Sequence, residues 1–213
     1  LAATTIAVDE DNTVWCGTYS NGLYRYDGSS WRTYTCENSG LTADTINSLC
    51  IDNEDNLWIS HNNNLTPNGL GVTRFDGLTW SNLFIDGPLS YSMLSVVVDN
   101  KNKKWFGTNS GGLTGYDGVR WHSYTMADTI RIMSTGALAV DTDNVLWMDY
   151  ETEYKHPDNY LMDWKVKGIL SFDGTTWTKY PQEATGMEYR PSEIAVDHDN
   201  VKWFSFGTSA NGI

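Results

Sequence analysis

The feature that most constrains this chain is a short segment that occurs five times. The first copy is Ile6–Trp15, and each copy runs from alternating apolar residues through an Asp and a polar turn to a Trp. The five Trp residues are separated by 43, 47, 42 and 56 residues: Trp15, Trp58, Trp105, Trp147 and Trp203. Self-similarity at such a period is typical of repeat architectures, in which each unit buries its apolar face against the next unit.

A second block follows each of the first four copies. It consists of Tyr or Phe followed by Asp and Gly, with another Trp three residues after the Gly: Trp31, Trp80, Trp121 and Trp177. Asp-Gly between two apolar runs is a strong signal for a β-hairpin. The polar turn of the first block carries Asp and Asn side chains, which hydrogen-bond the backbone and tolerate the left-handed conformation.

Each unit therefore predicts four short strands, which in the first unit are residues 6–9, 14–18, 22–26 and 31–34. Four strands in about 45 residues are the signature of a propeller blade. We predict an all-β chain, a β-propeller of four-stranded antiparallel blades with four complete repeats and a partial fifth. The expected blades span approximately residues 4–46, 47–93, 94–135, 136–191 and 192–213, within a single propeller domain or propeller fragment covering residues 1–213.

The two blocks resemble the two-component regulator propeller repeat. The resemblance is carried by Ile-x-x-Asp-x-x-Asn-x-x-Trp-x-Gly-Thr and Gly-Leu-x-x-Tyr-Asp-Gly, and it is clearest at residues 8–31 and 98–121. Proteins with this repeat include periplasmic sensor domains of hybrid histidine kinases and some secreted or surface proteins. The resemblance thus implies carbohydrate sensing by a periplasmic or extracellular bacterial protein. The chain contains fewer repeats than the larger propellers of that family and no kinase region, so we expect a piece of a longer polypeptide.

The charge balance excludes some partners. The chain has 27 Asp and Glu against 14 Lys and Arg, which gives a formal net charge of −13. Nucleic acids and anionic membranes attract clustered positive charge, so neither is an expected partner. The apolar runs are also too short to cross a bilayer, and we expect no membrane insertion within this chain.

Variation among the units is confined to one end of the strands. In a four-stranded meander, the tight first-to-second and third-to-fourth turns share one face, here called the turn face. The remaining connections share the opposite loop face, and binding residues concentrate on variable loops of a rigid scaffold. The largest insertion, residues 151–167, holds the only Trp outside the repeat. From it and from the Asn-rich loop 61–70 we predict these ligand-binding residues: Tyr154, His156, Tyr160, Trp164 and Asn63.

The central channel provides one further candidate residue. The first strand of each blade lies innermost, so the residue before each apolar triplet is expected near the axis: Thr5, Ser48, Ser95, Ala137 and Glu193. Four of these residues are small and uncharged. Glu193, the charged member, is therefore a predicted ligand-binding residue at the mouth of the channel.

The sequence shows no constellation typical of metal binding or catalysis. The Asp-rich turns lack the Gly and Glu positions of an EF-hand, and Asx turns explain all five of them. The four His residues stand at unrelated blade positions, without paired spacing. We therefore predict no metal, no cofactor and no catalytic residues.

The leading hypothesis is a non-enzymatic, sensor-type recognition module that binds a glycan or a protein partner through its loop face. One alternative is a propeller enzyme, a lyase or hydrolase acting on a polysaccharide or macrocycle, because the repeats loosely resemble those of streptogramin lyases. A second alternative is a structural surface repeat protein whose long loops make assembly contacts.

Overall fold

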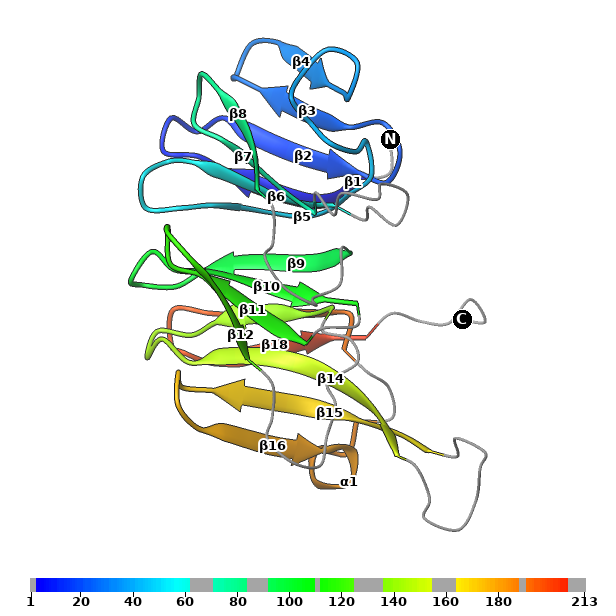
Figure 1. Cartoon of the computed structure of the whole chain (residues 1–213). Helices are drawn as coiled ribbons and strands as arrows, with labels where there is room; N and C mark the ends of the chain where they lie inside the picture. The colour runs from blue at the N-terminus through cyan, green and yellow to red at the C-terminus, as the bar shows by residue number, and fades with distance from the viewer. Residues whose placement is uncertain are drawn as a thin grey trace.

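The computed structural model describes residues 3–61, 71–83, 92–109, 112–124, 136–154, 164–187 and 191–206. Within these ranges the chain forms four four-stranded antiparallel sheets and one two-stranded sheet (Figure 1). Consecutive strands pair with one another in every sheet, as expected for propeller blades. The predicted all-β propeller architecture is therefore confirmed.

The strands of the blades follow in chain order. The first two blades consist of β1 (Ala3–Val8), β2 (Val14–Thr18), β3 (Leu23–Tyr26), β4 (Trp31–Tyr34), β5 (Ile46–Ile51), β6 (Leu57–His61), β7 (Val72–Phe75) and β8 (Trp80–Leu83). The third and fourth blades consist of β9 (Met93–Val98), β10 (Lys104–Thr108), β11 (Leu113–Tyr116), β12 (Trp121–Tyr124), β13 (Leu138–Val140), β14 (Leu146–Tyr154), β15 (Trp164–Phe172) and β16 (Trp177–Pro181). A short helix, α1 (Gln182–Thr185), leads to the fifth blade, β17 (Glu193–Val196) and β18 (Lys202–Ser205).

The sequence predicted the second and fourth strands of the first blade correctly, but its innermost strand begins earlier, at Ala3 instead of Ile6. A register shift between Ala3 and Thr5 allows the pairing with β2 to continue toward the N-terminus. The inner strands β5 and β9 also begin before their predicted blades, at Ile46 and Met93. Register shifts of this kind occur in β1, β5 and β9, where the pairing continues beyond the irregularity.

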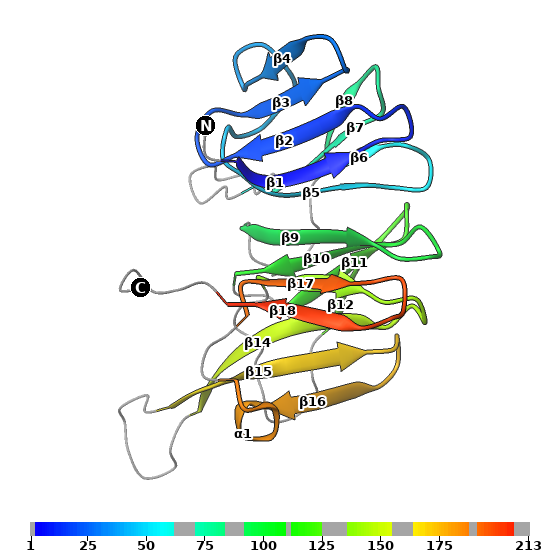
Figure 2. The ribbon, with the colours of Figure 1, turned by 180° about the vertical axis from the view of Figure 1, so that it is seen from behind.

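The innermost strands β1, β5, β9, β13 and β17 lie one after another around the centre (Figures 1 and 2). A central cavity of about 370 Å³ is lined by the apolar triplets of four blades: Leu49–Ile51, Val96–Val98, Leu138–Val140 and Ile194–Val196. Thr5 and Ser48 join neighbouring inner strands. Their hydroxyl oxygens accept the backbone N–H of Leu49 at 3.2 Å and of Val96 at 3.3 Å, respectively.

The fixed spacing of Asp and Trp in the repeat has a direct structural cause. One carboxylate oxygen of the Asp accepts the backbone N–H four residues later, and the other accepts the indole Nε1–H six residues later. The second bond occurs in all five blades: Asp9–Trp15 at 3.0 Å, Asp52–Trp58 at 2.8 Å, Asp99–Trp105 at 2.8 Å, Asp141–Trp147 at 2.8 Å and Asp197–Trp203 at 2.7 Å. The pair thus closes the turn and fixes the indole ring at the same time.

The same turns also connect neighbouring blades. Each contains one residue with φ between 60° and 64°: Asn12, Asp55, Asn102, Asn144 and Asn200. Asn and Asp adopt this left-handed conformation more readily than other side chains. In the last four of these five residues, the side-chain Oδ1 accepts a backbone N–H from the preceding blade, at donor–acceptor distances of 3.2, 3.1, 2.8 and 3.1 Å. We call this contact the Asx link. The Asx turns that the sequence predicted are separate bonds within each turn, such as that from the Glu54 N–H to Asp52 Oδ1.

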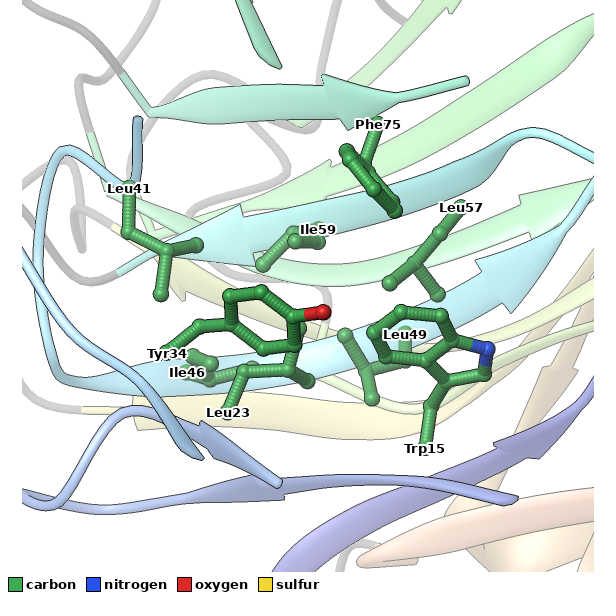
Figure 3. Packing of buried hydrophobic residues seen from close by; sticks show 9 residues of the cluster. All are labelled: Trp15, Leu23, Tyr34, Leu41, Ile46, Leu49, Leu57, Ile59 and Phe75. Carbon is green, nitrogen blue, oxygen red and sulfur yellow. The ribbon is translucent and has the colours of Figure 1, made fainter. Parts of the chain in front are cut away.

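The hydrophobic core is divided among the interfaces between blades. Between the first and second blades, Trp15, Leu23 and Tyr34 pack against Leu57 and other residues of the second blade (Figure 3). The Trp15 ring meets the edge of Phe75 at a centroid distance of 5.8 Å. Because each blade buries its apolar residues against its neighbours, a single blade lacks a complete core of its own.

Within the described residues, no helix has the length and apolar character needed to span a membrane.

Candidate functional site

The predicted insertion in the fourth blade is partly strand. β14 and β15 have nine residues each, whereas the corresponding strands of the third blade have five and four. Tyr154 and Trp164 are Cα partners at the end of this hairpin. The expectation of a loop over all of residues 151–167 was therefore wrong at both ends, because the β-branched and aromatic residues there favour strand pairing.

The other predicted binding residues are not brought to this hairpin by the described structure. Glu193 is exposed and opens β17, in the fifth blade, where it pairs with Ser205. His156, Tyr160 and Asn63 lie outside the described residues.

The base of the hairpin is firmly anchored. Asp149 is fully buried, and its Oδ1 accepts the backbone N–H of Gly136 at 2.8 Å and of Ala137 at 2.7 Å. Next to it, the buried Tyr150 ring packs over Gly168, where a Cβ atom would come within 2.8 Å of the ring. Burial raises the pKa of Tyr150. Sequence analysis missed both residues, although an Asp in place of the usual small residue of the second strand is a visible signal.

The turn face, expected to be plain, contains two clefts. The first cleft lies between the first and second blades and has a volume of about 350 Å³, and the second cleft lies between the second and third blades and has a volume of about 430 Å³. The second cleft is lined by Glu54, Asn56 and Arg74 of the second blade, and by Lys101, Asn102 and Tyr116 of the third blade, among others.

A buried ion pair forms the floor of the second cleft. Lys104 Nζ lies 2.8 Å from Asp52 Oδ2, and the two side chains are only 6% and 1% exposed. Burial tends to raise the pKa of Asp52, but hydrogen bonds from Lys104, from the Trp58 indole and from backbone N–H groups outweigh it and hold the pKa at about 2. Lys104 Nζ also lies 5.0 Å from the centre of the Trp58 ring.

Arg74 and Arg25 occupy the same position in successive blades but have different partners. Each is the Cα partner of its repeat Trp. Arg25 lies 5.6 Å from the Trp15 ring and 3.8 Å from an oxygen of Asp27. Arg74 instead donates from Nη2 to Asn56 Oδ1 at 2.7 Å.

No carboxylate forms an ion pair with Arg74 in the part of the chain that the structure describes. Its Nε is, over the same residues, the one buried side-chain nitrogen or oxygen without a hydrogen-bond partner. An Arg occurs at this strand position in the first two blades, whereas Gly115 and Ser171 occupy it in the third and fourth blades.

Among the described residues, no group of three or more His, Cys, Asp or Glu is placed to hold a metal ion. His61 is fully buried, and its Nε2 lies 2.9 Å from Thr73 Oγ1. Burial lowers the pKa of His61 to about 4, so this ring is neutral at physiological pH and serves the packing of the second blade.

The family profile described as two component regulator propeller matches residues 40–63. The chain carries this propeller repeat. The matched segment contains Asp52, Trp58 and the turn between them, and the resemblance found in the sequence is thereby confirmed. No curated protein matches the sequence.

Solved propeller structures share the fold. The extracellular domain of BT3049 from B. thetaiotaomicron, described as a hybrid two component system, matches 96% of this chain and 26% of that chain, with a TM-score of 0.72 and 16% identity. PorZ, a surface component of the type-IX secretion system of Porphyromonas gingivalis, matches 95% of this chain and 31% of its own, with a TM-score of 0.60 and 18% identity. Virginiamycin B lyase from Staphylococcus aureus matches 95% of this chain and 77% of its own, with a TM-score of 0.60 and 13% identity.

At these identities the likeness shows the fold alone. This chain spans about a quarter of the length of the extracellular two-component-system domains that it matches. Such extracellular domains and enzymes are both among the matched structures.

Proposed function

We propose that this chain is part of a non-enzymatic recognition module outside the bacterial cytoplasm, which binds a glycan or a protein partner through its loop face. The β14–β15 hairpin carries the proposal. It extends the fourth blade beyond the strand length of the other blades and brings the backbones of Tyr154 and Trp164 together at its end. The extracellular location of several matched domains supports the same function.

The chemistry of the insertion favours a glycan. Aromatic side chains stack on the apolar faces of sugar rings and keep a polar edge for hydrogen bonds. The insertion contains two Tyr and one Trp within residues 151–167. Asp149 and Tyr150 are buried at the base of the strand from which the insertion extends, and a well-anchored base suits a recognition site.

A glycan array with two variants tests this proposal. In one variant, a Gly-Ser linker replaces residues 155–163 and Trp164→Ala is added. In the control, Leu78→Ser changes a residue of the turn face that is 91% exposed. We expect glycan binding to be lost in the first variant and retained in the second. Binding that survives the loop replacement, or release of products from a bound polysaccharide, would contradict the proposal.

A further inference from the structure

We propose that the second cleft, on the turn face, binds a small ligand with one carboxylate and several hydroxyl groups, an acidic sugar unit, with Arg74 as its counter-ion. This inference deepens the proposed function, on which it rests for the class of ligand. It concerns a different face of the propeller, so the two sites can be tested separately.

The first observation is that no described carboxylate lies within ion-pair distance of Arg74. Asp76 has its pKa lowered mainly by hydrogen bonds from Thr79 and Leu78, and the charge of Arg74 contributes to that shift without a direct contact. A half-buried guanidinium without a counter-charge is costly, because burial removes hydration that nothing replaces. Lys104 from the next blade pairs with Asp52 and lies over the Trp58 ring, which corresponds to the ring that Arg25 covers in the first blade. The neutral amide of Asn56 is left as the acceptor for one guanidinium nitrogen.

The first cleft provides an internal comparison. There Leu57 takes the position of Lys104, so Arg25 stays over the Trp15 ring and within 3.8 Å of Asp27. Arg25 is thus supplied with a carboxylate by its own blade. In the second blade the corresponding carboxylate, Asp76, accepts the backbone N–H groups of Leu78 and Thr79. The two arginines therefore differ in that only Arg25 has a described carboxylate within ion-pair distance.

The carboxylates near Arg74 have other partners. Asp117, which also lines the cleft, accepts the backbone N–H of Val119 at 2.8 Å and of Arg120 at 2.7 Å, and lies 2.9 Å from His122 Nε2. Asp52 is held by Lys104. A ligand carboxylate is therefore the matching group for Arg74, because guanidinium and carboxylate form paired, charge-assisted hydrogen bonds.

The rest of the lining fits hydroxyl groups. Lys101, Asn102 and Ser81 supply donors, while Glu54 supplies an acceptor whose nearest amide partners are as far as 3.4 and 3.5 Å. Hydroxyls both donate and accept, whereas an acidic peptide side chain would use the donors alone. The cleft volume of about 430 Å³ lies in the range of small-molecule sites.

The net charge of the chain limits the ligand to low charge density. At −13, the chain repels long polyanions by its overall field. A single carboxylate on an otherwise neutral sugar avoids most of that repulsion. The observations therefore favour one acidic residue of a mixed glycan over a polyuronate.

Calorimetric titration with glucuronic acid and galacturonic acid tests this site, with glucose and acetate as matched probes at the same ionic strength. We expect at least one of the two acids to bind about tenfold more tightly than glucose and acetate, the gain of one charge-assisted hydrogen-bond pair. Arg74→Gln should weaken that binding about tenfold, while Arg25→Gln should leave it within about twofold. Circular dichroism checks the fold of both variants, and Arg74→Lys replaces Arg74→Gln if the latter does not fold.

Four results would overturn the inference. They are no saturable binding of either acid, equal binding of acetate, an unchanged affinity in the Arg74 variant, or tighter binding of an acidic peptide than of both sugars. The variant with a linker at residues 155–163 separates the two sites. It should keep the affinity for the acidic sugar, even where the glycan binding of the loop face is lost.

Discussion

The blades of this propeller meet in two kinds of interface. Between the first and second blades, the residue that precedes the repeat Trp of the later blade is Leu57, and its cross-strand partner is Phe75. Between the second and third blades, the same two positions hold Lys104 and Tyr116. The later interfaces repeat the alternation, with Leu146 and Phe172 followed by Lys202.

The two kinds of interface satisfy the repeat Trp in different ways. In every interface a cation lies near the indole ring: Arg25 at 5.6 Å from Trp15, Lys104 at 5.0 Å from Trp58, Lys103 at 4.0 Å from Trp105 and Lys202 at 5.0 Å from Trp147. At the Leu interfaces the cation comes from the same blade as the Trp, and at the Lys interfaces it comes from the next blade. The comparison indicates that each interface needs a cation over the indole ring, and that this cation can come from either of the two blades.

The largest effect is expected from removing a cation at a Lys interface. Lys104→Ala removes the partner of the buried Asp52 carboxylate and also empties the space that the buried Lys side chain fills, and the two losses together cost about 3–5 kcal/mol of unfolding free energy. Urea denaturation of the purified protein measures this loss. Lys101→Ala, an exposed neighbour, serves as the control and should change the free energy by less than about 0.5 kcal/mol. A cost below about 1 kcal/mol for Lys104→Ala would show that the ion pair contributes little.

Converting one kind of interface into the other should cost less. The double variant Lys104→Leu with Tyr116→Phe gives the second and third blades the residues of a Leu interface, and we expect a loss below about 1.5 kcal/mol in the same experiment. The reason is that Asp99, buried at the next Leu interface, has no ion pair among the described residues and is held by N–H groups. If the double variant lost as much unfolding free energy as Lys104→Ala, the cost would come from the uncompensated charge of Asp52.

Acid should weaken the Lys interface specifically. The pKa of Asp52 is about 2 in the folded protein, below its usual value of about 4 in an unfolded chain. The stabilisation from this pair is therefore complete above pH about 4 and is lost as the pH falls through about 2, at a cost of about 1 kcal/mol. Urea denaturation at pH 5 and pH 2.5 should show a larger acid-induced loss in the unmodified protein than in the double variant. Equal losses would contradict the assignment.

The smallest effect is expected at the Asx link. Asn102→Gly keeps the left-handed backbone available but removes the side chain that accepts the N–H of Asn53, and we expect a loss of about 0.5–1 kcal/mol. Asn12→Gly is the matched control, because Asn12 has the same φ but no preceding-blade donor in the described structure. Thermal unfolding compares the two variants. A larger loss in Asn12→Gly would show that the link itself does not stabilise the interface.

Much of the fold followed from the repeat alone. The Asp and Asn residues of the repeat predicted the turns, because their side chains hydrogen-bond the backbone. The hydrogen bond from the Trp indole to the same Asp carboxylate was not predicted. Leu57 and Lys104 were equally visible, but nothing in the sequence says that the residue before the Trp faces the preceding blade. The clefts were missed for that reason, since Arg74 becomes unusual only once Lys104 is seen to occupy its place.

The candidate site on the loop face was predicted less completely. The unusual length of residues 151–167 was evident, and so was the position of Trp164 outside the repeat. Strand pairing within the insertion was not evident from the sequence. The insertion occurs in one unit only, so no other unit offers an equivalent segment from which its strand register could be inferred. The roles of the predicted residues in binding therefore remain predictions.

The alternation of Leu and Lys interfaces also bears on how such a chain can lengthen. Duplication of the third unit alone, for example, would give the Trp105 indole two cations, Lys103 from its own unit and the copy of Lys104 from the next unit. Duplication of a pair of units preserves the match at every new junction, because each pair begins with a Leu unit and ends with a Lys unit. The interfaces thus define a two-blade module as the step by which this array can grow without loss of stability.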